Sequence, residues 1–571
     1  MNAITFIIKQ FPLNLKLNLF LILFLSLTNS ILEVIGIGML IPIFKIVQNF
    51  DNFSIYLVNN FHFLNFVSNL NQAKLLNIAL IFFLGILSLK YLNYLYLNRL
   101  SINFSAKSKI FLSSRIFYSF SSRDYIFFKN KNSSLILRDV LIEVTEFCDR
   151  FILSGLNLVI EFLIIFLVTF FLLFKETKLI FFFIIYLVPF YFIFYVFIKN
   201  KIEKASLIRS ELDERKIFIV KNFLNNIKVI KTQNKETFFI NTFTKYISNF
   251  EFTFANFNFV QIISRPYFEF VGLFFIFAWL IISINQGVLL KDIFLSFTIL
   301  VVACIRILPS INRVAYNWGQ VKFSKPSTTI IYRELNNARQ VLDSNFLNKK
   351  NIKFDYEICL KNISFKYDKK ESNLLNELSL EIKKGDKICI LGESGSGKTT
   401  LIEIIAGLLK PTAGSIVIDK FFFINNTNER LQLTYIPQDL TLMDGTIADN
   451  ICLGEEVDPH KLKLAMKNSL VETFLNDDEN NIYTDVGEIG KKFSGGQRQR
   501  INLARSFYEN NDLIIFDESI NAVDHETKLT LVENIFLQLE EKTIIFALHD
   551  KSFLHKFDKI YELKDGKLTR L

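Results

Sequence analysis

The sequence has few cysteines, and those that it has show no pairing pattern. The five are scattered and never form a CxxC motif: Cys148, Cys304, Cys359, Cys389 and Cys452. An odd, dispersed set argues against a disulfide framework and against a zinc site, so we expect reduced, mostly buried thiols. Trp (2) and Pro (9) are also rare while Phe occurs 64 times, but this bias extends over the whole chain and excludes no function.

Long apolar runs are absent after residue 320 and frequent before it. A chain of 571 residues with 51% hydrophobic residues is too long and too apolar for one soluble domain. Crossing a hydrocarbon core of about 30 Å takes roughly 20 apolar residues. Such runs predict six transmembrane helices, near residues 17–47, 75–98, 152–174, 177–198, 258–285 and 293–316. The first run carries Glu33 and lacks a small-x-small cleavage site, so we expect it to be retained.

Basic residues are absent between Gln48 and Ala73 but frequent in two other segments. Ten lie between Lys90 and Arg150, and eleven lie between Lys199 and Lys245. Because Lys and Arg accumulate in cytoplasmic segments, both of these segments and both termini are predicted to face the cytoplasm. The net charge of +10 therefore indicates membrane orientation and gives no support to nucleic-acid binding.

The hydropathy pattern changes after Ser324-Lys325-Pro326 to short apolar strands alternating with polar helices, which is typical of a soluble α/β domain. We predict a membrane domain over residues 1–325, with six helices and two long cytoplasmic loops. A linker over 326–353 and the α/β domain over 354–571 follow. Polar residues spaced three or four apart in Phe53 to Leu70 suggest either an amphipathic helix at the outer leaflet or a plain loop.

Residues Gly392 to Thr399 (GESGSGKT) match the phosphate-binding P-loop pattern between an apolar strand and an apolar helix. The glycines let backbone N–H groups surround the β-phosphate, and the helix N-terminus adds its dipole. Lys398 would neutralise the β- and γ-phosphates, and Thr399 would bind Mg²⁺. The candidate ATP-binding residues here are Gly392, Ser394, Gly395, Ser396, Gly397, Lys398, Thr399 and Thr400.

A second apolar strand, Leu513 to Phe516, ends in Asp517 and Glu518, which is the Walker B arrangement. Asp517 would hold Mg²⁺ through its water shell, and Glu518 would polarise the attacking water. Two acids at a strand end are weak support alone, because strands often stop at solvated acids. Together with a P-loop earlier in the same α/β domain they predict an ATP-hydrolysing site.

The segment Phe493 to Arg500 (FSGGQRQR) resembles the signature of ABC ATPases. The resemblance covers the whole soluble domain and implies several roles. Tyr367 would stack on adenine, Gln438 would be the Q-loop ligand near Mg²⁺, and His549 would contact the γ-phosphate. In this family, Ser494, Gly495, Gly496 and Gln497 close on the ATP of the opposite subunit. Phe493, Asn521 and Asp550 depart from the usual residues, but none removes a phosphate, magnesium or water-activating group.

Six spans followed by one ATPase domain resemble a half-transporter of the ABC exporter type. The resemblance implies a dimer of this chain, or of this chain with a close paralogue, and ATP and Mg²⁺ as cofactors. It also implies coupling helices within Asp124 to Asn130 and roughly Ile208 to Lys221. The membrane segments around Glu33, Arg265, Glu269 and Arg306 are similar to the bacterial lipid-linked oligosaccharide flippase of protein glycosylation.

Charged residues inside spans usually mark a transport path or an ion pair, so Glu33, Glu161, Arg265, Glu269 and Arg306 are candidates for lining a cavity. The alternative is that they pair for packing or extend to an interface. Arg265 and Arg306 are candidates for binding pyrophosphate, because guanidinium groups hold phosphate bidentately.

The resemblance implies an ATP-driven transporter of the bacterial inner membrane, with a cytoplasmic ATPase domain. It would flip a lipid-linked oligosaccharide, or a similar amphipathic lipid, from the inner to the outer leaflet. A peptide or hydrophobic-compound exporter is the alternative within the class. From another class, an ATP-gated channel or a membrane regulator remains open.

Overall fold

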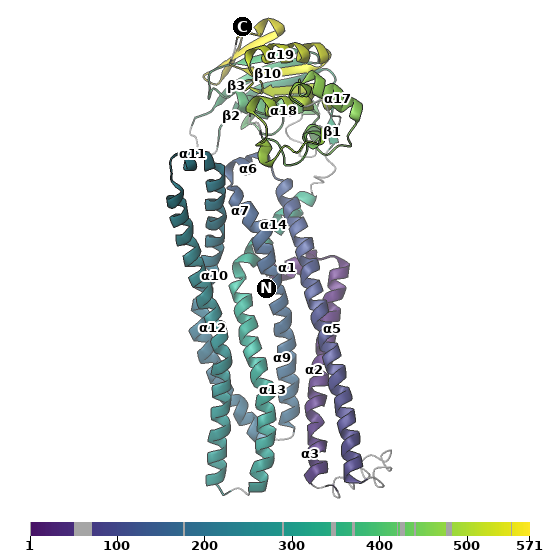
Figure 1. Cartoon of the computed structure of the whole chain (residues 1–571), viewed down its shortest axis with the longest axis vertical. Helices are drawn as coiled ribbons and strands as arrows, with labels where there is room; N and C mark the ends of the chain where they lie inside the picture. Colours follow the sequence, from purple (N-terminus) through teal and green to yellow (C-terminus); the bar gives the residue numbers. More distant parts are fainter. Residues whose placement is uncertain are drawn as a thin grey trace. The chain divides into compact units, whose positions relative to one another are not determined.

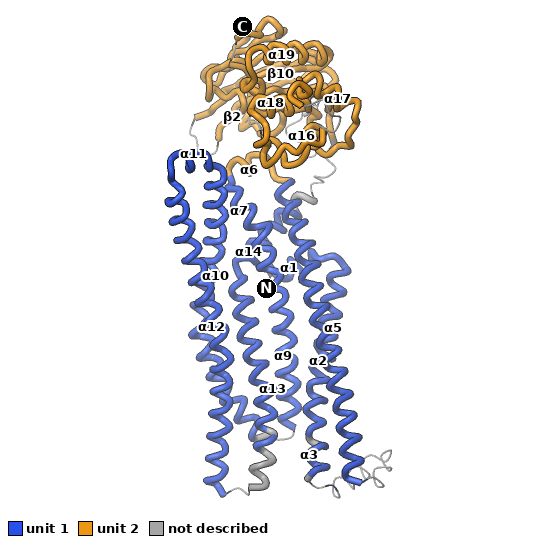
Figure 2. The backbone as a smooth tube through the Cα atoms, viewed as in Figure 1, with its two compact units in different colours: residues 1–121, 131–340 blue, residues 122–130, 341–571 orange. Residues whose placement is uncertain are grey.

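The structure is a computed structural model that divides into two compact units (Figure 2). It describes residues 2–48, 50, 71–174, 177–287, 290–343, 350–367, 372–419, 421–422, 429–438, 441–475, 482–549 and 551–571. Unit 1 comprises residues 1–121 and 131–340, and unit 2 comprises residues 122–130 and 341–571. The predicted external segment Phe53 to Leu70 lies outside the described residues.

Unit 1 consists of helices, and its longest ones run alongside one another (Figure 1). Two short π-helical segments precede α9. The elements are α1 (Asn2–Gln10), α2 (Leu13–Gly38), α3 (Leu40–Gln48), α5 (Gln72–Ser121), α7 (Ser133–Leu137), η2 (Arg138–Glu143), α8 (Val144–Glu146), η3 (Phe147–Leu153), α9 (Ser154–Leu173), α10 (Thr177–Asn225), α11 (Ile227–Thr232), α12 (Glu236–Asn285), α13 (Leu290–Phe323) and α14 (Lys325–Asp343).

Five helical stretches among the described residues are long and apolar enough to cross a membrane. They are Leu13–Val47, Gln72–Ser121, Ser133–Leu173, Leu179–Asn225 and Glu236–Asn285. The sixth predicted span, residues 293–316, falls on α13. A core of fully buried side chains, including Phe183, Leu300 and Ala303, joins α9, α10, α12 and α13.

The two long basic segments are not loops, and in this respect the prediction was wrong. Residues 99–121 continue α5, and residues 199–225 continue α10 without interruption. Neither stretch contains proline or glycine, so nothing in the sequence stops the helix at the membrane boundary. For the same reason Ile208 to Lys221 is not a separate short helix. The short helix between α10 and α12 is α11.

Unit 2 contains a mainly parallel sheet with strand order β12-β11-β4-β10-β9-β8. An antiparallel sheet, β3-β2-β5-β6, and the parallel pair β1-β7 accompany it. The strands are β1 (Lys350–Ile352), β2 (Glu357–Phe365), β3 (Leu375–Lys383), β4 (Lys387–Leu391), β5 (Ala413–Ile418), β6 (Phe421–Phe422), β7 (Glu429–Leu431), β8 (Thr434–Ile436), β9 (Leu513–Asp517), β10 (Thr543–Leu548), β11 (Lys559–Lys564) and β12 (Lys567–Arg570).

The helices of unit 2 pack around these sheets. They are α6 (Tyr125–Asn130), α15 (Lys398–Ile405), α16 (Ile447–Cys452), α17 (Pro459–Asn468), η5 (Glu472–Phe474), η7 (Glu488–Gly490), α18 (Gly495–Tyr508), α19 (His525–Gln538) and η8 (Leu554–Lys556). Every residue of β4, β9 and β10 is buried, as expected for central strands of a covered parallel sheet. Because β4, β10, β9 and β8 are parallel neighbours, their carboxyl ends lie at one edge of the sheet. The residues that follow them are therefore brought together.

Candidate functional site

The loop that follows β4 is built to surround an anion. Gly395 and Gly397 have φ values of +81° and +105°, which other residues adopt only with strain. Gly392 is also restricted, because a Cβ there would lie 2.7 Å from the backbone oxygen of Leu563. The hydroxyl of Ser396 is buried and has no hydrogen-bond partner within the described residues. A phosphate oxygen, which accepts hydrogen bonds, fits this donor.

Lys398 begins α15 and is the cation at the centre of the loop. Its Nζ donates to the backbone oxygens of Gly392 (2.8 Å) and Glu393 (3.1 Å). It also lies 3.4 Å from Oε1 of Glu518 and 3.2 Å from Nε2 of His549. Its side chain is only 4% exposed. A buried ammonium with this many oxygen neighbours is positioned to exchange carbonyl contacts for phosphate contacts.

Glu518 follows β9 and meets residues from three other strand ends. Its Oε1 lies 2.8 Å from Nε2 of His549, which follows β10. Its Oε2 accepts a hydrogen bond of 2.9 Å from Nε2 of Gln438, which follows β8. The backbone of Glu518 has φ +49°, a left-handed conformation that is uncommon for a non-glycine residue and concentrates at functional sites. The three predicted catalytic residues thus form one cluster with Lys398.

Asp517 is held by two hydroxyl groups. Thr399 Oγ1 donates to its Oδ1 at 3.2 Å, and Tyr435 OH donates to its Oδ2 at 3.0 Å. Burial raises the pKa of this carboxyl above its usual value, and the two hydrogen bonds oppose that shift. Tyr435 was not predicted as a site residue. Its position could have indicated it, because it lies near the end of β8, three residues before the predicted Gln438.

The described residues fit ATP with Mg²⁺ better than a metal held by protein alone. No cluster of three or more His, Cys, Asp or Glu side chains suited to a metal occurs among them. Instead, the hydroxyl of Thr399 at the end of the P-loop and the carboxylate of Asp517 lie within hydrogen-bond distance of each other. Mg²⁺ is usually bound by one or two such ligands, with phosphates and water completing the octahedron.

Tyr367, predicted to stack on adenine, lies next to the P-loop helix. Its OH is 3.1 Å from Oγ1 of Thr400 and accepts a hydrogen bond of 3.1 Å from Nζ of Lys129 on α6. Lys129 also donates to Oε2 of Glu403 at 3.2 Å. Glu403 belongs to α15, and its side chain is 5% exposed. Segment 122–130 is therefore bonded directly to the helix that carries Lys398.

The signature residues Ser494 to Gln497 form the start of α18. Ser494 Oγ accepts from the N–H of Gln497 at 3.3 Å, and Gln497 Oε1 accepts from the N–H of Ser494 at 2.8 Å, which is a capping box. A Cβ on Gly496 would lie 3.2 Å from the oxygen of Ala522, and one on Gly495 would lie 3.8 Å from the Ala522 side chain. The two glycines thus allow the segment around Ala522 to pack closely on the helix start.

In unit 1, Glu33 of α2 lies between two cations. Its Oε2 is 2.5 Å from Nζ of Lys90 on α5, and its Oε1 is 2.8 Å from Nη1 of Arg306 on α13. The side chains of Glu33 and Lys90 are 9% and 10% exposed, whereas Arg306 is 40% exposed. Two of the predicted charges therefore pair with each other, and Lys90, which had been counted with the cytoplasmic basic residues, joins them.

Two further ion pairs lie on the membrane helices. Glu161 of α9 pairs with Arg313 of α13, a residue that was not predicted although it lies seven positions after Arg306. Arg265 and Glu269 pair with each other along α12 at 2.8 Å, with side chains 74% and 53% exposed. Among the described residues, no hydrogen bond or ion pair links Arg265 or Glu269 to the Glu33 cluster.

The comparisons with known proteins agree in the soluble part. Residues 375–521 match the family model of the ABC transporter. The chain is 35% identical over 222 residues to ABC transporter B family member 29, chloroplastic, of Arabidopsis thaliana, covering 38% of this chain and 35% of that one. It is 34% identical over 214 residues to an ATP-dependent lipid A-core flippase of Pseudoalteromonas translucida, covering 37% of each.

A third relative is a leukotoxin translocation ATP-binding protein of a Pasteurella haemolytica-like species, 34% identical over 37% of this chain and 30% of its own. The matched region thus spans about a third of the length of these curated relatives. The fold agrees over much more of the chain. A bacterial Atm1-family ABC exporter, solved with ATP bound, superposes with a TM-score of 0.76 over 95% of this chain and 94% of the other, at 17% identity.

The predicted fold class is confirmed by these findings. Residues 375–521 therefore form an ABC transporter domain, and the chain has the ABC exporter fold, with membrane-type helices followed by an α/β ATPase domain.

Proposed function

We propose that this chain is half of an ATP-driven transporter that moves an amphipathic lipid from the inner to the outer leaflet of a bacterial inner membrane. The observation that carries the proposal is the position of segment 122–130. It follows α5 and precedes α7, which are both membrane-unit helices, yet it packs within unit 2. Ile126 contacts the hydrophobic core of unit 2, and Lys129 contacts Tyr367 and Glu403.

This connection gives ATP binding a direct mechanical route to the membrane helices. A shift of Tyr367 or α15 when nucleotide binds would move Lys129, and the peptide chain would carry that movement into α5 and α7. No flexible linker intervenes on the α5 side, because only Ser122 to Asp124 separate the two helices. The predicted coupling role of Asp124 to Asn130 is thus supported by contacts on the ATP side.

Hydrolysis would be carried by the residues that converge at the sheet edge. Glu518 would accept a proton from the attacking water, while Gln438 and His549 hold its two carboxylate oxygens in place. Lys398 would bind the phosphates, and Thr399 and Asp517 would hold Mg²⁺. When bound, Mg²⁺ neutralises the phosphate charge that develops during bond cleavage.

A homodimer, or a dimer with a close paralogue, completes the site in this proposal. The start of α18 offers N–H groups to an anion, and the resemblance to ABC ATPases assigns that anion to the ATP of the opposite subunit. Ser494, Gly495, Gly496 and Gln497 would therefore act in the partner's site.

A lipid-linked oligosaccharide with a pyrophosphate is our preferred substrate. One face of α13 carries Arg306, Ser310 and Arg313 toward α2 and α9, where Glu33 and Glu161 meet them. Arg306 keeps 40% of its side chain exposed, so it is paired but still accessible to an anionic headgroup. Arg265 is more exposed, at 74%. The relatives named as lipid A-core flippases also favour a lipid.

The leukotoxin translocation relative keeps a peptide exporter as the alternative substrate class. An ATP-gated channel or a membrane regulator is the alternative of another class. Transport by the Glu518→Gln variant separates these cases. A pump carrying this change should bind ATP but stop moving its substrate, whereas undiminished flux would rule out ATP-driven pumping.

The substrate is best identified in proteoliposomes that contain a panel of labelled lipids and peptides. We expect ATP-dependent loss of inner-leaflet label for a pyrophosphate-linked glycolipid and none for the peptides. Changing both Arg265 and Arg306 to Ala should abolish this loss while leaving hydrolysis without lipid unchanged. Ile305→Ala, at the exposed neighbour of Arg306, is the control. Unchanged flipping in the double variant would refute the pyrophosphate assignment.

A further inference from the structure

A face of α13 next to the one that carries its charged residues borders a cavity of about 320 Å³ within unit 1. Its walls come from α9, α10 and α13, and Phe268 of α12 closes it. Leu187, Phe268 and Ile307 form a buried floor, with 6%, 1% and 3% exposure. Phe162 of α9 and Val188 of α10 are 54% and 60% exposed, so they mark the mouth. An engineered cavity of about 150 Å³ already binds benzene, so this cavity has room for a hydrocarbon chain.

The cavity has almost nothing to offer a polar ligand. Thr169 and Tyr191 are the only polar residues among the eleven that line it. The Thr169 hydroxyl already donates to the backbone oxygen of Ile165 at 2.7 Å. All of the lining residues also fall inside the predicted spans. At that depth a membrane offers lipid hydrocarbon, which matches the lining chemically.

A second, smaller hollow of about 30 Å³ neighbours the first, and Tyr191 lines both. It lies between α10 and α13, and its lining changes from apolar to aromatic and then to basic. The rings of Tyr195 and Trp318 are tilted by 58° with their centroids 6.5 Å apart. Lys199 and Lys322 line the hollow as well, and Nζ of Lys322 lies 5.3 Å from the Trp318 ring centroid. Tyr and Trp prefer the membrane interface, and lysines there attract anionic headgroups.

The length of this path matches one leaflet. From Ile184 in the large cavity to Lys199 in the small hollow, α10 advances 15 residues, which is about 22 Å at 1.5 Å per residue. Half of a hydrocarbon core of about 30 Å, together with part of a headgroup layer, has a similar extent. Lys199 is the first residue after the predicted span 177–198, so the basic end lies where headgroups are expected.

We propose that the two hollows form one groove, the α10–α13 groove, that binds an anionic phospholipid of the membrane. One acyl chain would occupy the large cavity, and the phosphate would lie at Lys199 and Lys322. The groove is separate from the charged face of α13, because Ile307, Ile311 and Val314 line it whereas Arg306, Ser310 and Arg313 meet α2 and α9. In this proposal the lipid is a resident ligand and is not the transported one, so the proposal does not depend on what the transporter carries.

The test measures lipid retained by the full-length protein after detergent extraction from vesicles of phosphatidylcholine and phosphatidylglycerol in equal amounts. Native mass spectrometry should find phosphatidylglycerol bound in preference to phosphatidylcholine. Each lysine at the interface contributes about five-fold to that preference, so the double variant Lys199→Ala/Lys322→Ala should lower it about 30-fold. The same preference in wild type and double variant would overturn the proposal.

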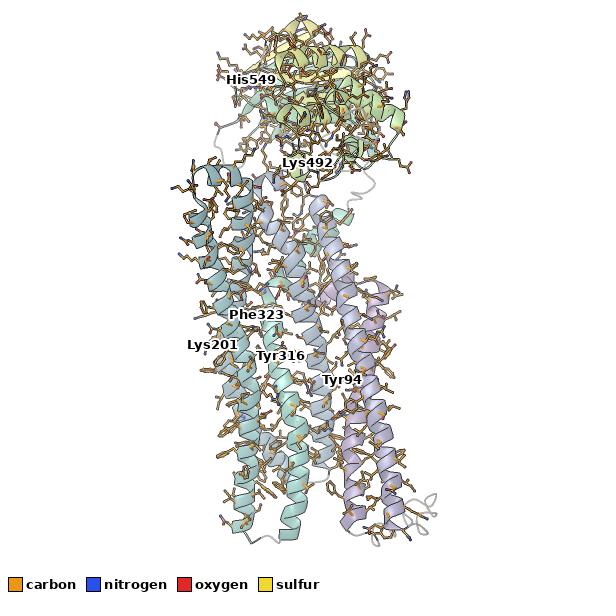
Figure 3. The ribbon with its side chains drawn as sticks, in the orientation of Figure 1. Tyr94, Lys201, Tyr316, Phe323, Lys492 and His549 are labelled. Atoms are coloured by element: carbon orange, nitrogen blue, oxygen red, sulfur yellow. The ribbon has the colours of Figure 1, made fainter. Side chains whose placement is uncertain are left out.

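Two further variants separate the chain site from the headgroup site. Val188→Trp, at the exposed mouth, should reduce retention of both lipids because the indole blocks the cavity. Lys201→Ala is the matched control, since Lys201 (labelled in Figure 3) lies on the same helix but contacts the ring of Phe197 at 4.3 Å and does not line the groove. It should leave retention unchanged, and a loss equal to that of Lys199→Ala would overturn the role of the groove.

Competition and crosslinking exclude the other occupants. Stoichiometric displacement of phosphatidylglycerol by a pyrophosphate-linked glycolipid, the preferred substrate, would make the groove part of the transport route and would overturn the resident-lipid proposal. A disulfide between two copies carrying Val188→Cys would assign the mouth to a contact between subunits, with the same consequence. We expect neither result, and tryptophan fluorescence of each variant should show the unfolding midpoint of the wild type.

Discussion

Glu33 in unit 1 and Glu518 in unit 2 occupy similar surroundings but are assembled in different ways. Each carboxylate lies between two basic side chains, Lys90 and Arg306 in one case and Lys398 and His549 in the other. The two side chains are almost equally buried, at 9% and 10% exposure. Glu518 is surrounded by residues that follow neighbouring parallel strands, whereas Glu33 depends on three separate helices.

Removing the charge of Glu33 and removing that of Glu518 should therefore have different effects on the structure. The surroundings of Glu518 are fixed by the backbone of a sheet whose central strands are fully buried, so the site should survive the loss of one charge. The surroundings of Glu33 are fixed by the ion pairs themselves. Removing that charge leaves two cations facing each other among apolar helices, where an unpaired charge is costly.

The largest expected effect is on catalysis by Glu518→Gln. A general base contributes about 10²- to 10⁴-fold, so the hydrolysis rate should fall by that factor while ATP binding persists. Malachite-green phosphate release and binding of a fluorescent ATP analogue would measure the two quantities. Glu541→Gln, the same change at an exposed turn, is the control. A hydrolysis rate above a tenth of the wild-type rate would contradict the assignment of Glu518 as the base.

The second prediction uses the two tryptophans, Trp279 on α12 and Trp318 on α13, which both belong to unit 1. Glu33→Gln should destabilise unit 1 by roughly 3–5 kcal/mol, because it leaves Lys90 and Arg306 without their shared anion. Tryptophan fluorescence should therefore report a lower unfolding midpoint for Glu33→Gln but not for Glu518→Gln. Equal midpoints for the two variants would remove the contrast between the regions.

The matched control for this effect is a second change in the same cluster. Adding Lys90→Met to Glu33→Gln removes one of the two facing cations and should recover part of the lost stability. Glu251→Gln, on an exposed part of α12, should leave the midpoint unchanged. Recovery by Lys90→Met would show that repulsion between the cations, and not a general defect in α2, caused the loss.

The same difference, between a site at neighbouring strand ends and a site made by separate helices, explains how well the sequence predicted each region. The P-loop, Asp517 and Glu518 lie in short motifs next to strands, so local order placed them in one site, and the resemblance to ABC ATPases added Gln438 and His549. The Glu33–Lys90 and Glu161–Arg313 pairs join residues 57 and 152 positions apart, and no motif marks such distances. Lys90 lay inside a predicted span but was counted with the cytoplasmic basic residues. Which side of α5 faces α2 depends on helix packing, so the sequence did not show that Lys90 pairs with Glu33.

Helix length was the other feature that the sequence predicted poorly. Hydropathy ends a span where apolar residues stop, but helix propagation depends on backbone propensity and on the absence of breakers. Residues 199–225 contain neither proline nor glycine, so α10 continues beyond the span. The prediction of loops confused the end of the membrane with the end of the helix.

Lys129→Ala tests the link between the regions and should have an intermediate effect. It leaves Glu403, which is 5% exposed, without its cation. Losing one partner of a partly buried pair costs about 1–3 kcal/mol, and this contact ties α6 to α15, so we expect substrate transport per ATP hydrolysed to fall roughly ten-fold. The charge swap Lys129→Glu/Glu403→Lys should restore part of the ratio. Lys410→Ala, which breaks the exposed pair with Asp124, should change it much less.

If Lys129→Ala and Lys410→Ala both leave the ratio unchanged, the segment 122–130 contributes through its general packing. The link would then be a property of Ile126 and its core contacts. The comparison would sharpen in that case, because charge would matter within each region but not for communication between them.

The smallest expected effect concerns Ser494, whose predicted ATP contact is with another subunit. Ser494 caps α18, and Thr446 caps α16 through the same capping-box arrangement. Replacing either with Ala should cost about 1 kcal/mol of stability, because each loses the hydroxyl that accepts from the helix N–H. Thr446→Ala should leave the hydrolysis rate nearly unchanged when corrected for folded protein. Ser494→Ala should lower it further, because the same hydroxyl would then be missing from the partner's ATP site. Equal hydrolysis rates in the two variants would show that Ser494 acts only as a helix cap. The proposed ATP site between two subunits would then lose the signature residue on which it most depends.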